Sequence, residues 1–271
     1  MDDANAGDRA FTGSIPELYD RYLGPMLFEP YALELAGRFR GFEGALLETA
    51  AGTGRVTRAL AEAVGPHARI TATDLNEPML ARAAQVVSAP NVAWRQVDAQ
   101  ALPFEDASFD AVVCQFGVMF FPDKAAGFAE ARRVLRPGGR FVFSVWDDLE
   151  ANDISEIVHK AVAAEFPDDP PSFIARMPFG YHDEGRIREA LETAGFGSVQ
   201  AERVALETPA ASAADAAKGL CMGSPLRGEI EARRPEGSDA VVVAVTEALE
   251  RVFGREAIAG KGRALVVTAT V

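Results

Sequence analysis

The stretch that most constrains the fold of this chain runs from Leu46 to Val56 and reads LLETAAGTGRV. An apolar run ends at Glu48, turns through small residues, and enters a helical pattern that continues to Leu60 and Val64. Glycines allow a ligand to approach the backbone, and the free N–H groups of a helix N-terminus favour polar or negative groups. The stretch therefore predicts a strand, a tight turn and a helix that hold a polar small molecule.

Further strand patterns alternate with helical patterns of ordinary length. They occupy residues 68–74, 92–97, 109–116 and 140–146. Such alternation predicts β–α–β units and an α/β fold with a doubly wound, mainly parallel sheet. Parallel sheets bind ligands outside the carboxyl ends of their strands. Four polar residues fall at those ends: Glu48, Asp74, Asp98 and Gln115.

The rest of the chain predicts additions to this core. An aromatic-rich N-terminal segment, with Gly24-Pro25 as a helix break, indicates a helical lid. A helical stretch before a final β-branched strand indicates a cap over the strand ends. The expected parts are a flexible terminus at 1–10, a lid at 11–44, a Rossmann-like core at 45–208, a cap at 209–262 and a last core strand at 263–271.

Composition excludes several functional classes. The net charge of −13 argues against binding of nucleic-acid backbones. The chain contains no run of about 18 apolar residues, so we expect no membrane span. Its acidic N-terminus lacks the apolar region of a signal peptide, so secretion is not expected. Cys114 and Cys221 are then expected to be free thiols in the cytoplasm. Three histidines and two distant cysteines form no metal-ligand cluster, so we expect no metal.

The residues around the glycines discriminate between nucleotide ligands. The dinucleotide-binding fingerprint G-x-G-x-x-G/A is not met here, because Thr57 stands where its third glycine or alanine is required. The acid at Glu48 repels a pyrophosphate but holds an ammonium group. Asp74 is placed to bind a ribose, and Asp98 suits an adenine amino group. An ammonium, a ribose and an adenine without phosphate describe S-adenosylmethionine.

Residues 46–146 resemble the class I S-adenosylmethionine-dependent methyltransferases, specifically the small-molecule branch related to ubiquinone/menaquinone-biosynthesis enzymes. The resemblance rests on the loop, the Asp74 strand end, and the segments VDAQALPFEDASFDAVVCQFGVMFFPD and EARRVLRPGGRFVFSVW. It implies a seven-stranded sheet whose last strand is antiparallel. One departure is Ala50, where the family usually has glycine, and we expect binding to survive the extra methyl group.

The resemblance also implies roles for residues around the methionine part of the cofactor. Glu48 and the loop backbone are expected to hold it, and the backbone carbonyl of Gln115 to accept from its ammonium. Tyr19 and Arg21 are expected to close over its carboxylate from the lid. The loop residues concerned are Ala50, Gly52, Thr53 and Gly54.

The nucleoside part is assigned in the same way. Asp74 is expected to bind the ribose hydroxyls, and Leu75 and Met79 to flank the adenine. Asp98 and the Ala99 N–H are expected to bind the adenine edge.

The acceptor side is less defined. Large side chains after strand ends or in loops suggest an apolar pocket, although the 17 phenylalanines must also fill the core. His182 is a candidate base for an acceptor hydroxyl or amine, with a satisfied loop histidine as the alternative. The candidate substrate contacts are Tyr22, Phe116, Met119, Trp146 and Tyr181.

These observations predict an enzyme that transfers a methyl group from S-adenosyl-L-methionine to an O, N or C nucleophile of a small, apolar or aromatic molecule. The product of the cofactor is then S-adenosyl-L-homocysteine, and the chain is expected to be a monomer or homodimer. Two alternatives stay open: an NAD-type oxidoreductase, and a non-catalytic protein that binds S-adenosylmethionine.

Overall fold

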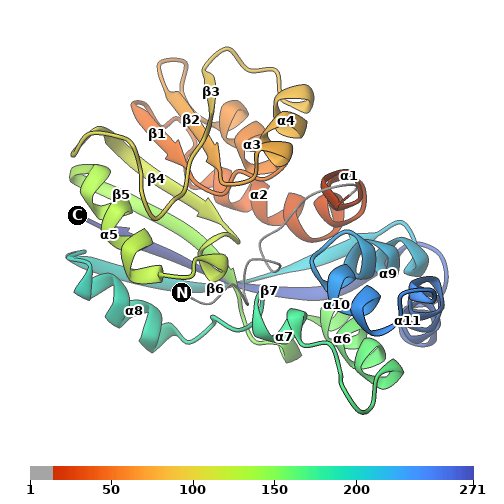
Figure 1. The fold of residues 1–271 in the computed structure, drawn as a ribbon. Coiled ribbons are helices and arrows are strands. Elements are labelled where there is room, and N and C mark those ends of the chain that lie inside the picture. The colour runs from red at the N-terminus through yellow and green to blue at the C-terminus, as the bar shows by residue number, and fades with distance from the viewer. Residues whose placement is uncertain (1–14) are drawn as a thin grey trace. The chain divides into compact units, whose positions relative to one another are not determined.

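One seven-stranded sheet, in the order β3-β2-β1-β4-β5-β7-β6, dominates the computed structural model, which describes residues 15–271 (Figure 1). Strands β1 to β5 pair in parallel, and β7 pairs antiparallel with β5. This confirms the expected sheet with its antiparallel last strand. The strands are β1 (Ala45–Glu48), β2 (Arg69–Asp74), β3 (Val92–Gln96), β4 (Phe109–Gln115), β5 (Leu135–Trp146), β6 (Ser198–Ala210) and β7 (Ile258–Thr270).

Helices connect the strands and fill the insertions. The predicted flexible terminus, and the start of the predicted lid, lie outside the described residues. The helices are α1 (Ile15–Leu18), η3 (Tyr19–Phe28), α2 (Glu29–Gly37), α3 (Arg55–Ala63), α4 (Glu77–Val86), η4 (Val118–Phe120), α5 (Lys124–Val134), η5 (Leu149–Ala151), α6 (Asp153–Glu165), α7 (Phe173–Arg176), α8 (Glu184–Thr193), α9 (Ala213–Met222), α10 (Leu226–Arg233) and α11 (Ser238–Phe253).

The chain divides into two compact units, which are described separately below. The helical unit comprises the described residues up to Pro30, Asp147–Gly180 and Ala205–Arg263. The sheet unit comprises Tyr31–Trp146, Tyr181–Val204 and Ala264–Val271. The predicted boundaries of lid, core and cap remain predictions.

Alternation along the strands gives the sheet unit two apolar faces. On one face, Leu60 of α3 packs with Leu46 of β1 and Val142 of β5 in a single buried cluster. On the other face, Phe128 of α5 lies with its ring centroid 5.7 Å from that of Phe143. Helices on both faces exclude water from the central strands, as the alternating sequence pattern predicts.

The parallel register brings the predicted polar residues to one edge. Glu48 is paired with Ala72 of β2 and Val113 of β4, so the carboxyl ends of these strands lie side by side. Asp74 and Gln115 are the last residues of their own strands. The sequence prediction of a polar edge is therefore confirmed for these three residues.

In the helical unit, the predicted break at Gly24-Pro25 is wrong, because the helix continues through it as the π-helix η3. The amide of Glu29 donates to the carbonyl of Gly24, five residues earlier. A proline ring normally clashes with the carbonyl four residues before it, and the wider π turn relieves this clash. The rings of Tyr19 and Phe28 stack at 4.7 Å.

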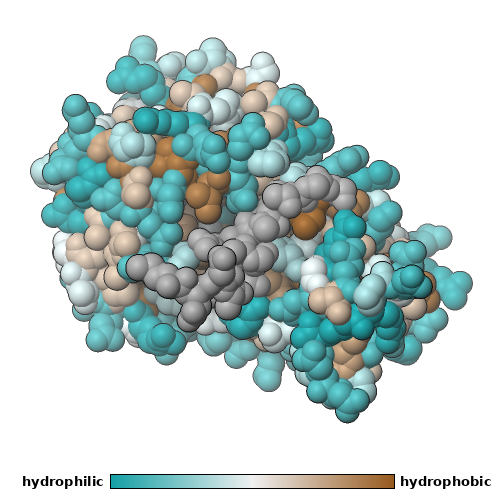
Figure 2. All heavy atoms as spheres, viewed as in Figure 1, coloured by the Kyte–Doolittle hydropathy of each residue, from teal (hydrophilic) through white to brown (hydrophobic). Residues whose placement is uncertain are grey.

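The surface shown in Figure 2 is mainly hydrophilic, with scattered hydrophobic residues. No helix within residues 15–271 is both long and apolar enough to cross a membrane. Among residues 15–271, the exposed large hydrophobic residues are Leu33, Leu75, Val86, Val243 and Val252. Of these, Leu75 directly follows the end of β2.

We predict that Gly54→Ala lowers the free energy of unfolding by about 2–4 kcal/mol. Gly54 has a φ of 83°, and an added Cβ falls 2.9 Å from Val87 Cγ2 and 3.0 Å from Ala83 Cβ. Urea unfolding followed by circular dichroism measures the change. Gly37→Ala is the control, because nothing lies within 4 Å of its added Cβ. Equal stability of both variants contradicts the prediction.

Candidate functional site

The loop after β1 is built by backbone hydrogen bonds to both neighbouring strands. Thr49 N–H donates to the carbonyl of Val113 at 2.9 Å, and Ala51 N–H donates to that of Thr73 at 2.9 Å. Gly52 and Gly54 have positive φ values of 56° and 83°, which glycine adopts without strain. The loop thus crosses the ends of β2 and β4 and leads into the N-terminus of α3.

Ala50, the departure from the family pattern, also has a positive φ of 54°. A Cβ added to Gly117 falls 2.4 Å from the Ala50 Cβ. The absence of a side chain at Gly117 therefore leaves room for the alanine methyl group. Sequence reasoning missed Gly117, because nothing local connects it with position 50.

Asp74 ties this loop to the end of β2. Its carboxylate accepts from Gly52 N–H at 2.8 Å and from Asn76 N–H at 2.8 Å. Burial raises the pKa of Asp74 above its ordinary value, and these donors offset part of the rise. A carboxylate has about four acceptor positions, so capacity remains for ligand hydroxyls.

Glu48 is the most unusual polar residue of the site. It is 1% exposed, and its Oε2 atom has no hydrogen-bond partner within the described chain. Burial raises its pKa from 4.5 to about 8; the Thr57 hydroxyl opposes this rise and the Asp74 carboxylate adds to it. A buried oxygen without a donor fits a site that receives an ammonium group from a ligand.

We predict that Glu48→Gln stabilises the ligand-free protein by roughly 1–3 kcal/mol at pH 8. The folded chain holds the Glu48 proton more tightly than the unfolded chain does. The free energy of unfolding of the wild type therefore falls as pH rises from 4.5 to about 8. Glutamine does not titrate, so the variant does not show this fall. Thermal unfolding at pH 6, 7 and 8 measures the difference. Glu62→Gln, which changes an exposed residue of α3, is the control. A stability difference between Glu48→Gln and wild type that stays constant from pH 6 to pH 8 contradicts the prediction.

The predicted adenine residues lie at the ends of β2 and β3. Asp98 accepts from Gln100 N–H at 2.9 Å and is half-buried. Leu75 is 42% exposed, as a ligand-flanking residue requires, whereas Met79 is buried with its Cε 3.8 Å from a Cβ built on Gly52. Met79 thus lies next to the loop at Gly52. Its contact with adenine stays a prediction, as does that of Ala99.

Three aromatic rings pack together beside the carboxyl ends of β4 and β5. Phe116 stacks on Trp146 with centroids 3.9 Å apart and an angle of 6° between planes. Tyr31 of α2 meets both rings edge-on, at 5.4 and 5.2 Å. All three residues are at most 6% exposed. Phe116 and Trp146 therefore act first as packing partners, and their contact with an acceptor stays a prediction.

Lys124 connects two predicted acceptor residues and was not anticipated. Its ammonium donates to the carbonyls of Met119 at 3.1 Å and Phe121 at 3.0 Å, and lies 4.8 Å from the centre of the Tyr181 ring. Burial and the nearby Arg186 lower the pKa of Lys124. Burial raises the pKa of Tyr181 to about 12. This clamp fixes the loop after β4 against the segment before α8.

We predict that Lys124→Met speeds amide hydrogen exchange at Phe120 and Phe121 about tenfold, the effect of losing ~1.4 kcal/mol of local contacts. Tyr181→Phe should leave exchange unchanged, because the Lys124 ammonium contacts the face of the ring, which phenylalanine retains. Tyr181→Leu should reproduce part of the effect. Lys160→Met, a change in an exposed lysine of α6, is the control. Unchanged exchange in Lys124→Met contradicts the clamp.

The remaining predicted residues are divided between the units. Tyr19, Arg21 and Tyr22 belong to the helical unit, and the cofactor loop belongs to the sheet unit. His182 lies in the sheet unit between Tyr181 and the N-cap Asp183 of α8. The roles of these four predicted residues stay predictions.

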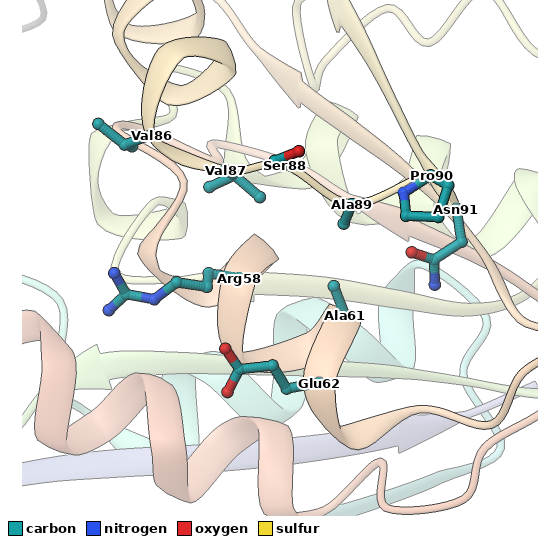
Figure 3. A pocket seen from close by; sticks show the side chains of 9 residues that line it. All are labelled: Arg58, Ala61, Glu62, Val86, Val87, Ser88, Ala89, Pro90 and Asn91. Atoms are coloured by element: carbon teal, nitrogen blue, oxygen red, sulfur yellow. The ribbon is translucent and has the colours of Figure 1, made fainter.

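A pocket of about 430 Å³ lies between α3 and the segment after α4 (Figure 3). It contains none of the predicted site residues. Figure 3 shows Arg58 and Glu62 on its α3 side. Val87, which lines it, also lies beside Gly54, so the pocket adjoins the far side of the glycine loop.

Comparisons with known proteins identify a methyltransferase domain in this chain. Residues 47–143 match the family model described as a methyltransferase domain. Ubiquinone/menaquinone biosynthesis C-methyltransferases from Burkholderia mallei and Burkholderia thailandensis are 35% identical over 167 residues, which cover 58% of this chain and 69% of each relative.

Solved structures share the fold. Phosphoethanolamine N-methyltransferase 2 from Haemonchus contortus, in complex with S-adenosyl-L-methionine, has a TM-score of 0.61 at 17% identity, covering 97% of this chain and 58% of that one. The [4+2]-cyclase SpnF has a TM-score of 0.57 at 17% identity, covering 94% of this chain and 92% of that one. A cyclase with this fold shows that the fold alone does not determine the reaction.

Proposed function

The chain belongs to the class I S-adenosylmethionine-dependent methyltransferases, and we propose that it methylates an O, N or C nucleophile of a small, apolar or aromatic acceptor. The observation that carries the proposal furthest is Glu48, a buried carboxyl group beside the glycine loop with an oxygen that lacks a donor. The ammonium of S-adenosylmethionine supplies such a donor. We assign the remaining methionine contacts to the loop backbone and the carbonyl of Gln115.

The bound cofactor supplies a methyl group on an already activated sulfonium. The chain's own residues then bind, align and exclude water. Asp74 is assigned to the ribose hydroxyls, while its bond to Gly52 keeps the loop in place. Leu75 and Asp98 are assigned to the adenine. The loop that Lys124 fixes, with Met119, is assigned to the wall of the acceptor site.

An NAD-type oxidoreductase is disfavoured by the same residues. Thr57 of α3 stands where the dinucleotide fingerprint requires glycine or alanine, and its larger side chain is fully buried. Glu48, the last residue of β1, places a buried carboxyl group directly before the glycine loop, whereas dinucleotide-binding folds hold a pyrophosphate at such a loop and helix N-terminus. Neither feature suits the pyrophosphate of a dinucleotide.

We predict that the protein binds S-adenosylmethionine and S-adenosylhomocysteine but not NAD. Asp74→Ala should weaken S-adenosylhomocysteine binding at least tenfold, ~1.4 kcal/mol, because it removes the ribose acceptor and frees the loop. Isothermal titration calorimetry measures both. Asp74→Asn, which keeps one acceptor oxygen, should lose less, and Asp168→Ala in an exposed loop is the control.

Binding of NAD alone, or of none of the three, contradicts the proposal. Where the first two bind, catechol, menadiol and benzylamine serve as probes of O-, C- and N-acceptors, with methylated product measured by mass spectrometry. Binding without any methylated product favours the non-catalytic alternative.

A further inference from the structure

Gln100 lies in the turn that follows β3, and its side chain bonds in two directions. The turn is closed by Ala101 N–H, which donates to the Asp98 carbonyl at 3.0 Å. The Gln100 Nε2 donates to Asp98 Oδ1 at 3.1 Å, and its Oε1 accepts from Asp123 N–H, at the N-cap of α5, at 2.8 Å. All of these residues belong to the sheet unit. Gln100 therefore links the acid after β3 to the start of α5.

The two partners require opposite properties of the side chain between them. The Asp98 carboxylate can only accept a hydrogen bond, and the Asp123 backbone N–H can only donate one. A side-chain amide provides both a donor and an acceptor, so these partners also determine which way the Gln100 amide points. Glutamate at this position cannot donate and repels Asp98, and leucine offers neither group. The residue type at position 100 thus matches a role between these two partners.

These bonds hold one oxygen of Asp98 and leave the other available. The backbone N–H of Gln100 donates to Oδ1 at 2.9 Å, as its Nε2 does, and none of residues 15–271 donates to Oδ2. Asp98 and Gln100 are both half-buried, so neither is enclosed in the core. A carboxylate that is already fixed at one oxygen loses less side-chain freedom when its other oxygen binds a ligand. Gln100 therefore prepares Asp98 to accept from a donor.

The segment around Gln100 is also anchored without it. Leu102 N–H donates to Glu130 Oε2 at 2.6 Å, and the Leu102 carbonyl accepts from Arg133 Nη2 at 2.8 Å. The Leu102 side chain is buried. Both partners are on α5, so the segment stays attached to this helix when the Gln100 bonds are removed. Loss of those bonds frees the Asp98 side chain rather than the whole segment.

We propose that Gln100 is a positioning residue that aims Oδ2 of Asp98 at the amino group of the cofactor's adenine, and that it thereby determines selectivity for adenine over hypoxanthine. The inference rests on the proposed function, in which Asp98 is assigned to the adenine. Adenine carries a donor at its 6-position, whereas hypoxanthine carries a carbonyl oxygen there. A fixed carboxylate attracts the first and repels the second, but a mobile carboxylate turns away from the carbonyl and discriminates less.

The test measures the affinities of S-adenosylhomocysteine and S-inosylhomocysteine by isothermal titration calorimetry. Wild type should bind the adenine compound about twentyfold more tightly or better, because a site built around a donor rejects an analogue without it. Gln100→Leu and Gln100→Glu should each reduce this ratio about fivefold, chiefly by weakening S-adenosylhomocysteine. Gln100→Glu keeps the side-chain length and the acceptor for Asp123, so it tests the inference where Gln100→Leu does not fold. Gln85→Leu, at an exposed glutamine of α4, is the control.

A second comparison establishes that Gln100 acts through Asp98. Asp98→Ala should itself remove most of the ratio between the two compounds. Adding Gln100→Leu to Asp98→Ala should not change the ratio further, because no carboxylate is left to position.

Equal affinity for the two compounds in wild type, or tighter binding of S-inosylhomocysteine, overturns the inference and leaves the proposed function in place, because the protein still binds the cofactor product. An unchanged ratio in both Gln100 variants also overturns it, since a purely structural role weakens both compounds equally. A further fall of the ratio in the double variant overturns the action through Asp98. Binding of neither compound by wild type contradicts the proposed function, and the inference falls with it.

Discussion

The hydrogen bond from the Gly52 amide to the Asp74 carboxylate is the interaction on which the site depends. It joins the glycine loop after β1 to the end of β2, while Thr49 bonds to β4 on the other side. The parallel register makes both bonds possible, because it aligns the carboxyl ends of the three strands. Positive φ values at Gly52 and Gly54 then turn the chain into α3.

Two buried carboxyl groups in this arrangement lower the stability of the folded chain. Glu48 and Asp74 are buried close together, and burial raises the pKa of both carboxyl groups. Stability alone gives no reason to bury Glu48 without a donor for its second oxygen. A cationic ligand provides that donor and neutralises the charge.

The sequence predicted the parallel part of the sheet and the polar edge, because β–α–β periodicity and strand-end residues are local signals. The antiparallel last strand was predicted from the resemblance to the methyltransferase family, not from a local signal. It was wrong about Gly24-Pro25, where packing of η3 on α9 allows a π-helix to continue through a local break signal. It missed Gly117 and Lys124. Each acts on a residue that is distant in sequence or belongs to another segment, and no local pattern reports such contacts.

By itself, then, the sequence determined the strand–turn–helix around Glu48 and the acids at the strand ends, since residue type and spacing suffice to specify them. Only the tertiary structure decided which of these residues touch. It placed the Phe116 ring on Trp146 and brought the Gln100 side chain to the backbone of Asp123. The physical reason is that backbone periodicity is encoded within a few residues, whereas side-chain contacts between distant segments depend on how whole elements pack.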